Sequence, residues 1–135
     1  MGFISKHWDL LADRYIKNSQ EDCTGGFAYE KYINTPSLFS MFPKKAFNVL
    51  DLGCGNGIFT LELAKHYPNV VGIDISNKML KEAKKIVKGG SFIQHDLEGP
   101  FPEFDHKFDL ITAKLLLMYI ENLDGFVEEC YKAME

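Results

Sequence analysis

The chain has 135 residues, of which 46% are hydrophobic and 25% are charged, a balance and a length typical of one globular domain. The formal net charge is −4, and Lys and Arg are spread along the chain without forming a basic stripe. This distribution argues against a nucleic acid as partner. The longest apolar run, residues 115–120, is far too short to span a bilayer, so we expect no membrane partner.

The cysteines and the first residues bear on location. Cys23, Cys54 and Cys130 are scattered and form no CxxC pair, which indicates free thiols rather than a disulfide framework. Lys6 and Asp9 come early and no apolar stretch follows them, so no secretory segment opens the sequence. Together these observations predict a cytoplasmic protein.

Residues 5–17 are predicted to form an amphipathic helix. Their apolar positions recur at helical spacing and form one stripe: Trp8, Leu11, Ala12, Tyr15 and Ile16. The polar, glycine-ended stretch 18–26 predicts a loop, and residues 27–34 predict a short helix. Thr35 followed by Pro36 predicts the start of another helix, with Thr35 as its N-cap, that ends at Pro43.

From Phe47 onward short apolar strands alternate with helices. The predicted strands span residues 47–52, 69–74, 91–95 and 108–113. The predicted helices span residues 57–66, a segment capped by Ser76 or Asn77 that runs to Val87, and residues 123–134. This alternation indicates an α/β protein with a parallel sheet wrapped by helices.

The most informative stretch is VLDLGCGNG, residues 49–57, in which a strand runs into three glycines and then a helix. Glycines there allow a tight turn and leave main-chain atoms open to a ligand across the end of the strand. A tight turn without a ligand is the alternative. The spacing is G-x-G-x-G, and Ile58 stands where the dinucleotide fingerprint has its third glycine, which disfavours a nicotinamide dehydrogenase.

These segments resemble the class I S-adenosylmethionine-dependent methyltransferases, of the small-molecule type. DLGCGNG, residues 51–57, is similar to the first motif of that family, and Asp74 ends VVGID as the ribose-binding acid does. The stretch that begins at Asp96, DLEGPFPEFDHKFDLITA, resembles the next signature. The opening helix resembles the segment that covers the site in the family, an aromatic-Asp-x-x-Ala-x-x-Tyr pattern carried here by Trp8, Asp9, Ala12 and Tyr15.

The resemblance implies a Rossmann-like doubly wound sheet in the order 3-2-1-4. It implies one S-adenosylmethionine-binding domain over 1–135, with an N-terminal helical lid at 1–45 and an incomplete core at 46–135. The family's sheet has three further strands, so we expect a chain truncated after its fourth strand. The edge of 108–113 would then be open, which predicts a homodimer or low stability.

The resemblance also implies the cofactor, S-adenosylmethionine, and its site, with no metal. Asp51 would bond the ammonium group of the cofactor, Asp74 the ribose and Asp96 the adenine amino group, with Leu97 beside the ring. The remaining implied site residues are Tyr15, Gly53, Cys54, Gly55, Gly57, Ile75 and Lys114.

Each of these residues also has a structural interpretation. Asp51 could cap the glycine loop, Asp74 could be a solvated strand end, and Asp96 could form a turn. Cys54 is expected to be a small filler, because nothing nearby in sequence would activate it. In the predicted strand, His95 should face away from Asp96.

Two further residues of the opening helix could lie either in the core or in the lid. Trp8 is expected in the core rather than in the lid, and Tyr15 fits either role.

The function implied by the resemblance is methyl transfer to a small-molecule acceptor. The wall on the acceptor side would be 114–119, where relatives often carry a His near the position of Met118, and this chain does not. We therefore assign no catalytic residue, and Tyr119 is a candidate hydrogen-bond donor. The alternative is a truncated, non-catalytic module that binds the cofactor or a partner.

Overall fold

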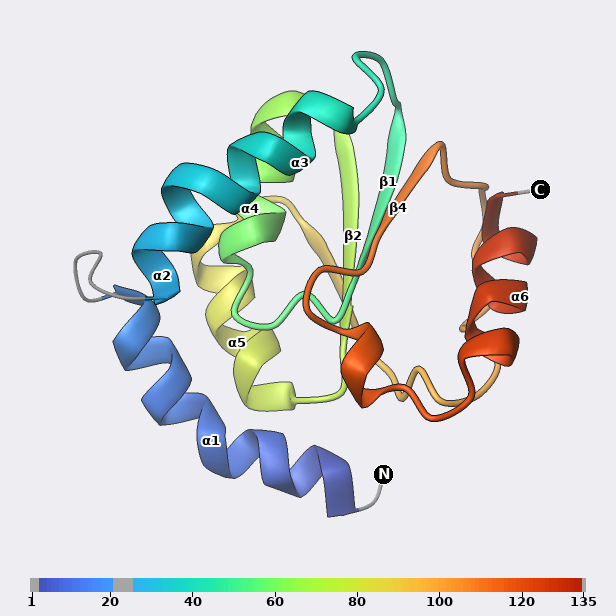
Figure 1. Ribbon diagram of the computed structural model, residues 1–135. Coiled ribbons are helices and arrows are strands. Elements are labelled where there is room, and N and C mark those ends of the chain that lie inside the picture. The colour runs from blue at the N-terminus through green and yellow to red at the C-terminus, as the bar shows by residue number, and fades with distance from the viewer. Residues whose placement is uncertain (1–2, 21–25, 135) are drawn as a thin grey trace.

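A computed structural model describes residues 3–20 and 26–134. Its centre is a four-stranded parallel sheet in the order β3-β2-β1-β4, which confirms the predicted order (Figure 1). The strands are β1 (Asn48–Leu52), β2 (Asn69–Asp74), β3 (Ser91–Gln94) and β4 (Leu110–Thr112). Because all four strands are parallel, their carboxyl ends meet at one edge of the sheet.

Helices cover the sheet on both sides, as Figure 1 shows. On one side lie α4 (Ile58–His66) and α5 (Asn77–Ile86), and on the other lies α6 (Leu123–Met134). A 3-10 turn, η2 (Leu117–Tyr119), lies in the connection between β4 and α6. Near the carboxyl ends of the strands, the N-terminal helix α1 (Phe3–Gln20) crosses below the sheet.

The strand β1 divides the core because its side chains alternate between the two faces. Leu50 and Leu52 are fully buried and pack with Phe126 of α6. Val49 faces the other way, in a cluster with Leu63 of α4. Asp51 follows the same alternation and therefore points to the side of α4, where Thr60 of that helix donates to its carboxylate.

The N-terminal helices differ in detail from the prediction. The first helix continues to Gln20 beyond the expected end at residue 17, and residues 21–25 of the predicted loop lie outside the described residues, as does Cys23. The predicted helix at 27–34 exists as α2 (Gly26–Tyr29) and a π-helical turn, η1 (Glu30–Asn34).

Thr35 is not an N-cap, because it is already helical as η1 runs directly into α3 (Thr35–Met41). Pro36 has no N–H to donate to the preceding turn, and the wide π turn accommodates that loss. The helix ends at Met41, two residues before the expected Pro43, because Phe42 precedes that proline and is held in an extended conformation.

The other boundaries follow side-chain contacts. Ser76, rather than Asn77, caps α5, with its hydroxyl accepting a hydrogen bond from Met79 N. The strand β4 begins later than expected because the Asp109 carboxylate accepts from Phe47 N and Asn48 N, both at 2.8 Å, and so ends the incoming loop.

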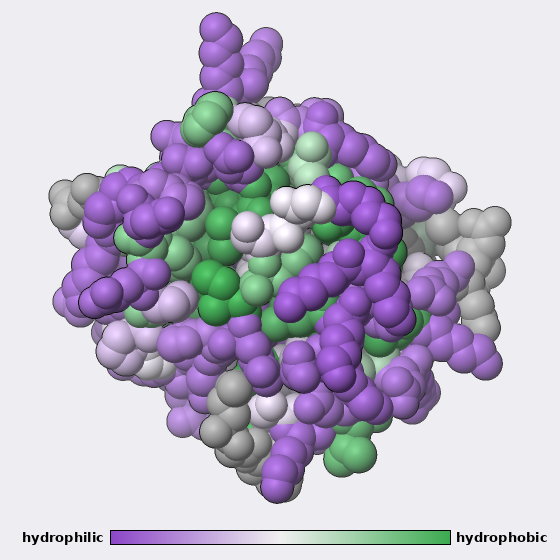
Figure 2. All heavy atoms as spheres, turned by 180° about the vertical axis from the view of Figure 1, so that it is seen from behind, coloured by the Kyte–Doolittle hydropathy of each residue, from purple (hydrophilic) through white to green (hydrophobic). Residues whose placement is uncertain are grey.

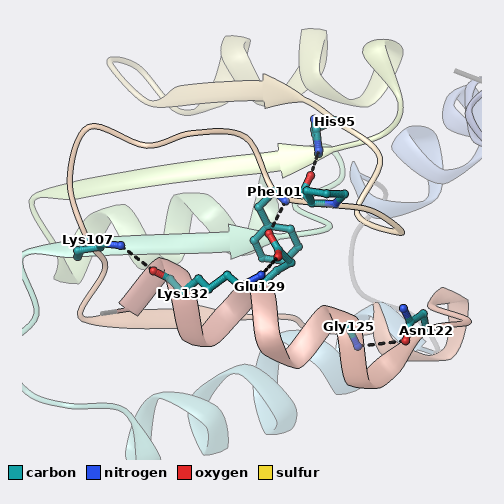
Figure 3. Close-up of polar contacts among 8 residues, drawn as sticks. His95, Phe101, Lys107, Asn122, Gly125, Glu129 and Lys132 are labelled. Carbon is teal, nitrogen blue, oxygen red and sulfur yellow. Dashed lines mark hydrogen bonds and ion pairs between the residues drawn. The ribbon is translucent and has the colours of Figure 1, made fainter.

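A long loop between β3 and β4 is fastened to α6 (Figure 3). Phe101 N donates to Glu129 Oε2 at 2.8 Å, and Lys107 Nζ donates to the carbonyl of Lys132 at 2.7 Å. The loop and the helix therefore form one layer against the sheet. On the reverse of the molecule, apolar side chains lie in a recess framed by hydrophilic ones (Figure 2).

Among the described residues, no helix is both long and apolar enough to cross a membrane.

Candidate functional site

The glycine loop between β1 and α4 has the left-handed backbone that its glycines permit. Gly55 has φ 54° and Gly57 has φ 83°, a region that costs other residues free energy. A Cβ on Gly57 would lie 2.8 Å from Ala83 Cβ, so this glycine allows α4 and α5 to pack closely. A Cβ on Gly55 would meet nothing within 4 Å, so this glycine faces open space.

Asp51 lies beneath the loop and is only 2% exposed. Its two carboxylate oxygens accept hydrogen bonds from Thr60 Oγ1 at 2.7 Å and from Thr112 Oγ1 at 2.9 Å. Burial raises the pKa of Asp51 to about 6, and the two threonine hydrogen bonds oppose that shift. Asp51 is thus a buried carboxylate whose negative charge would gain from a nearby cation.

Asp74 ends β2 and joins two loops. Its Oδ2 accepts from Gly55 N at 2.8 Å, and its Oδ1 accepts from Ser76 N at 2.9 Å. Burial raises the pKa of Asp74, while these two backbone donors act in the opposite direction. Each oxygen retains a lone pair for a further donor, so the carboxylate is held in place and can still bind a ligand hydroxyl.

One cavity of about 1240 Å³ opens at the carboxyl ends of the strands. It is larger than the roughly 300–1,000 Å³ of a usual small-molecule pocket. All of the predicted site residues line it except Gly57: Tyr15, Asp51, Gly53, Cys54, Gly55, Asp74, Ile75, Asp96, Leu97 and Lys114. Gly57 lies against Ala83 instead, so its role is in packing.

The far end of this cavity is formed after β3. Asp96 Oδ1 accepts from Glu98 N at 3.1 Å, which makes Asp96 a turn-forming residue as well as a lining residue. Leu97 is buried beside it, and Met79 of α5 lines the same cavity. Sequence reasoning missed Met79, although its position three residues after the Ser76 cap points it back toward the strand ends.

His95 does not follow the predicted strand alternation. The strand β3 ends at Gln94, and His95 Nε2 lies 2.8 Å from the carbonyl of Pro100 (Figure 3). His95 therefore stabilises the loop that follows, and it also lines the cavity beside Asp96, which the expectation that it faces away did not anticipate.

Cys54 is buried, and burial raises its pKa well above the usual value, with Asp51 and Asp74 adding to the shift. The raised pKa favours the neutral thiol of Cys54, whereas a nucleophilic cysteine reacts as the thiolate. This supports the interpretation of Cys54 as a small filler in the cavity wall.

The helix α1 closes one side of the cavity. Trp8 lines it and meets the ring of Tyr119 edge to face, with centroids 5.1 Å apart. Trp8 is only partly buried in the cavity wall, which corrects the expectation of a core position. Tyr15 also lines the cavity, and burial, followed by the nearby Glu30 and Asp74, raises its pKa.

An ion pair that sequence reasoning missed joins η1 to the segment after β4. Lys114 Nζ lies 2.5 Å from Glu30 Oε2 and 5.2 Å from the centre of the Phe59 ring. Burial favours protonation of Glu30, but hydrogen bonds from Lys114 and Asn34 outweigh it and lower the pKa of Glu30. Lys114 therefore lines the cavity while its ammonium group pairs with Glu30 of η1.

Comparisons with known proteins find a matching family and similar structures. Residues 50–135 match the family described as "Methyltransferase domain". Malonyl-[acyl-carrier protein] O-methyltransferase 2 of Ilyobacter polytropus is 32% identical over 96 residues, 67% of this chain and 36% of that protein. Trans-aconitate 2-methyltransferase of Paracidovorax citrulli is 32% identical over 91 residues, 66% of this chain and 35% of that protein.

Among solved structures, an S-adenosylmethionine-dependent methyltransferase from Mesorhizobium loti superposes with a TM-score of 0.67 at 30% identity, over 74% of this chain and 48% of the other. The chain spans less than half the length of these curated relatives and of this solved structure.

Proposed function

Because this chain belongs to the methyltransferase domain family that residues 50–135 match, we propose that it binds S-adenosylmethionine and transfers the methyl group to a small-molecule acceptor. The observation that carries the proposal is the arrangement of Asp51, Gly55 and Asp74 around one cavity. Two carboxylates that line one cavity beside a glycine that faces open space suit a ligand with a cationic end and a diol.

The proposal assigns the parts of the cofactor to chemically matched residues. Asp74 accepts hydrogen bonds from the two ribose hydroxyls, and Asp51 attracts the ammonium group from beneath the loop. Asp96 accepts from the adenine amino group, with Leu97 against the ring. Further contacts are assigned to Tyr15, Gly53, Cys54, Gly55, Ile75 and Lys114.

The bound cofactor supplies an electrophilic methyl group on a positive sulfur. That chemistry would form a bond from the methyl carbon to an O, N, S or C atom of the acceptor, break the carbon–sulfur bond to leave S-adenosylhomocysteine, and release any acceptor proton to water. The chain's part is to hold the two reactants in line and to exclude water. Trp8, Tyr119 and the neighbouring wall serve that purpose, and we assign no residue to the removal of a proton from the acceptor.

The acceptor side of the cavity is assigned to residues 114–119 with Phe59 and Ile58 across from them. The lining there is mostly apolar, which suits a small organic molecule better than a nucleic acid backbone. The two curated relatives described above are named for the acceptors malonyl-[acyl-carrier protein] and trans-aconitate.

The other parts of the proposal concern organisation and location. We assign 1–45 to a helical lid and 46–135 to the cofactor-binding core. The free thiols of Cys54 and Cys130 support a cytoplasmic location. Because β4 lies at an edge of the described sheet, we also propose that the chain self-associates through this strand. Sedimentation over a range of protein concentrations tests this proposal.

Calorimetric titration tests the main proposal. S-adenosylmethionine and its demethylated product, S-adenosylhomocysteine, should bind at one site per chain, and NAD at equal concentration should give no binding heat. Tighter binding of NAD than of S-adenosylhomocysteine would contradict the proposal.

A further inference from the structure

A continuous line of hydrogen bonds joins the lid helix α1 to the carboxylate at the end of β2. Ser76 Oγ donates to Asp9 Oδ1 at 2.5 Å, and Ser76 N donates to Asp74 Oδ1 at 2.9 Å. Asp74 in turn accepts from Gly55 N in the glycine loop. One buried serine therefore connects α1 to Asp74.

Every polar group of Ser76 in this line is in use. Its hydroxyl donates to Asp9 and at the same time accepts from Met79 N, the bond that caps α5. Asp9 also accepts from Lys78 N at 3.3 Å, so its carboxylate lies at the positive N-terminal end of α5. Because Ser76 satisfies three groups at once, displacing Asp9 changes the hydrogen bonding of the turn that orients Asp74.

We propose that Asp9 is a positioning residue that couples the docking of α1 to the orientation of the Asp74 carboxylate. The inference rests on the proposed function, because Asp74 is the residue assigned to the ribose. By linkage, a ligand that binds Asp74 stabilises the docked position of α1, and docking of α1 strengthens binding of that ligand to the same extent.

The chain contains its own reporter of this docking. Trp8 is the only tryptophan of the sequence and precedes Asp9 on α1. Its ring lies in the cavity wall against Tyr119, so undocking of α1 would move it into water. Quenching of Trp8 fluorescence by acrylamide therefore measures docking without any need for enzyme activity.

The test compares Asp9→Ala with Asp13→Ala. Asp13 lies one turn further along α1 and forms an exposed ion pair with Lys78, at 3.1 Å, but does not contact Ser76. We expect Asp9→Ala to increase quenching of Trp8 and to weaken binding of S-adenosylhomocysteine by about 5- to 10-fold. Asp13→Ala should leave both within about twofold of the wild type, since exposed ion pairs contribute little.

A conservative variant separates positioning from general damage to the helix. Asp9→Asn keeps an oxygen that accepts from Ser76 Oγ, so it should restore low quenching and most of the affinity. If Asp9→Ala lowers cooperative melting too far for titration, the comparison of Asp9→Asn with wild type decides. If Asp9→Asn melts normally but binds S-adenosylhomocysteine as weakly as Asp9→Ala is expected to, the proposed hydrogen-bonded link would be overturned.

A double-mutant cycle tests whether the effect passes through Asp74. In an Asp74→Asn background, Asp9→Ala should cost much less affinity than it does in the wild type, because the two changes act on one network. Additive losses would overturn the proposal and leave Asp9 as a simple tether. Failure of the wild type to bind S-adenosylhomocysteine at all would instead count against the proposed function, while quenching of Trp8 in the free variants would still report on docking.

Discussion

Lys114 and Glu30 form an ion pair, with 2.5 Å between Nζ and Oε2, that joins the segment after β4 to η1. The two side chains are 18% and 23% exposed, which places the pair between an exposed surface contact and a buried one. Both line the cavity, so the pair fixes the N-terminal helices against the wall assigned to the acceptor.

We expect Lys114→Met to lower the free energy of unfolding by about 1–2 kcal/mol, because Glu30 loses its cation in a partly desolvated place. Urea unfolding measures the change. Lys65→Met is a matched control, since its pair with Glu62 is exposed to 56% and 38% and should contribute less than about 0.5 kcal/mol. Equal effects of the two variants would show that the Lys114 pair does not hold the helices.

Asp74→Ala should weaken binding of S-adenosylhomocysteine by about 10- to 100-fold, because two hydrogen bonds to a charged acceptor are lost. The variant should also melt at a lower temperature, since Gly55 N and Ser76 N lose their acceptor. Asp109→Ala is the control, because Asp109 likewise accepts from two backbone N–H groups but lies away from the cavity. It should lower stability and leave affinity unchanged.

Asp51 should make stability depend on pH. Its pKa is raised by burial from 3.8 to about 6, so the folded chain binds more protons than the unfolded chain between these values. The free energy of unfolding therefore falls as the pH rises through this window, and the loss is complete above about pH 6, at about 3 kcal/mol.

Asp51→Asn removes this loss while keeping an acceptor for a threonine hydroxyl. The difference in unfolding free energy between the variant and the wild type should accordingly change in favour of the variant between pH 4 and about 6. Unfolding in urea at a series of pH values measures it. Two curves that run parallel over this range would show that Asp51 is not the titrating group.

Gly57→Ala and Gly55→Ala should separate packing from binding. Gly57→Ala adds a Cβ 2.8 Å from Ala83 Cβ at a positive φ, and we expect a loss of about 3 kcal/mol in stability. Gly55→Ala has only the backbone penalty of about 1–2 kcal/mol, because no atom lies within 4 Å of the new Cβ. Its methyl group enters the cavity, so S-adenosylhomocysteine titration of the folded variant should show weakened binding.

His95→Ala should leave affinity for S-adenosylhomocysteine within about threefold of the wild type. The contact of His95 Nε2 with the carbonyl of Pro100 gives the imidazole a structural task in the loop, although it lies beside Asp96. Calorimetry of the purified variant measures this. A tenfold loss would make His95 a binding residue.

Local patterns predicted the sheet, and the residues that the family resemblance implied for a site, except Gly57, line one cavity. Alternation of strands and helices, the three glycines and the acids at the ends of β2 and β3 are short-range signals, and each survives in the structure. They work because a strand end, a tight turn and a helix cap are determined within a few residues.

Contacts between segments that are distant in the sequence could not be predicted from such local patterns. Nothing in the spacing pairs Glu30 with Lys114, or Asp9 with Ser76, because two residues separated by many positions carry no shared periodicity. The π turn before Pro36 and the early end of β3 at Gln94 were missed for a related reason. Both boundaries depend on contacts that residue type alone does not specify.

The tethers of α1 also bear on the order in which the chain folds. Ser5 donates to the carbonyl of Ile75 and Asp9 accepts from Ser76, across sequence separations of 70 and 67 residues. The register of β1 with β2, in contrast, begins with Asn48 beside Asn69. Closing the loop between α1 and the start of α5 costs more entropy than pairing β1 with β2. The hydrogen bonds that compensate for this cost can form only after Ser76 has capped α5. The helix α1 is therefore expected to dock among the last of the described elements, and its amide hydrogens should exchange before those of the sheet.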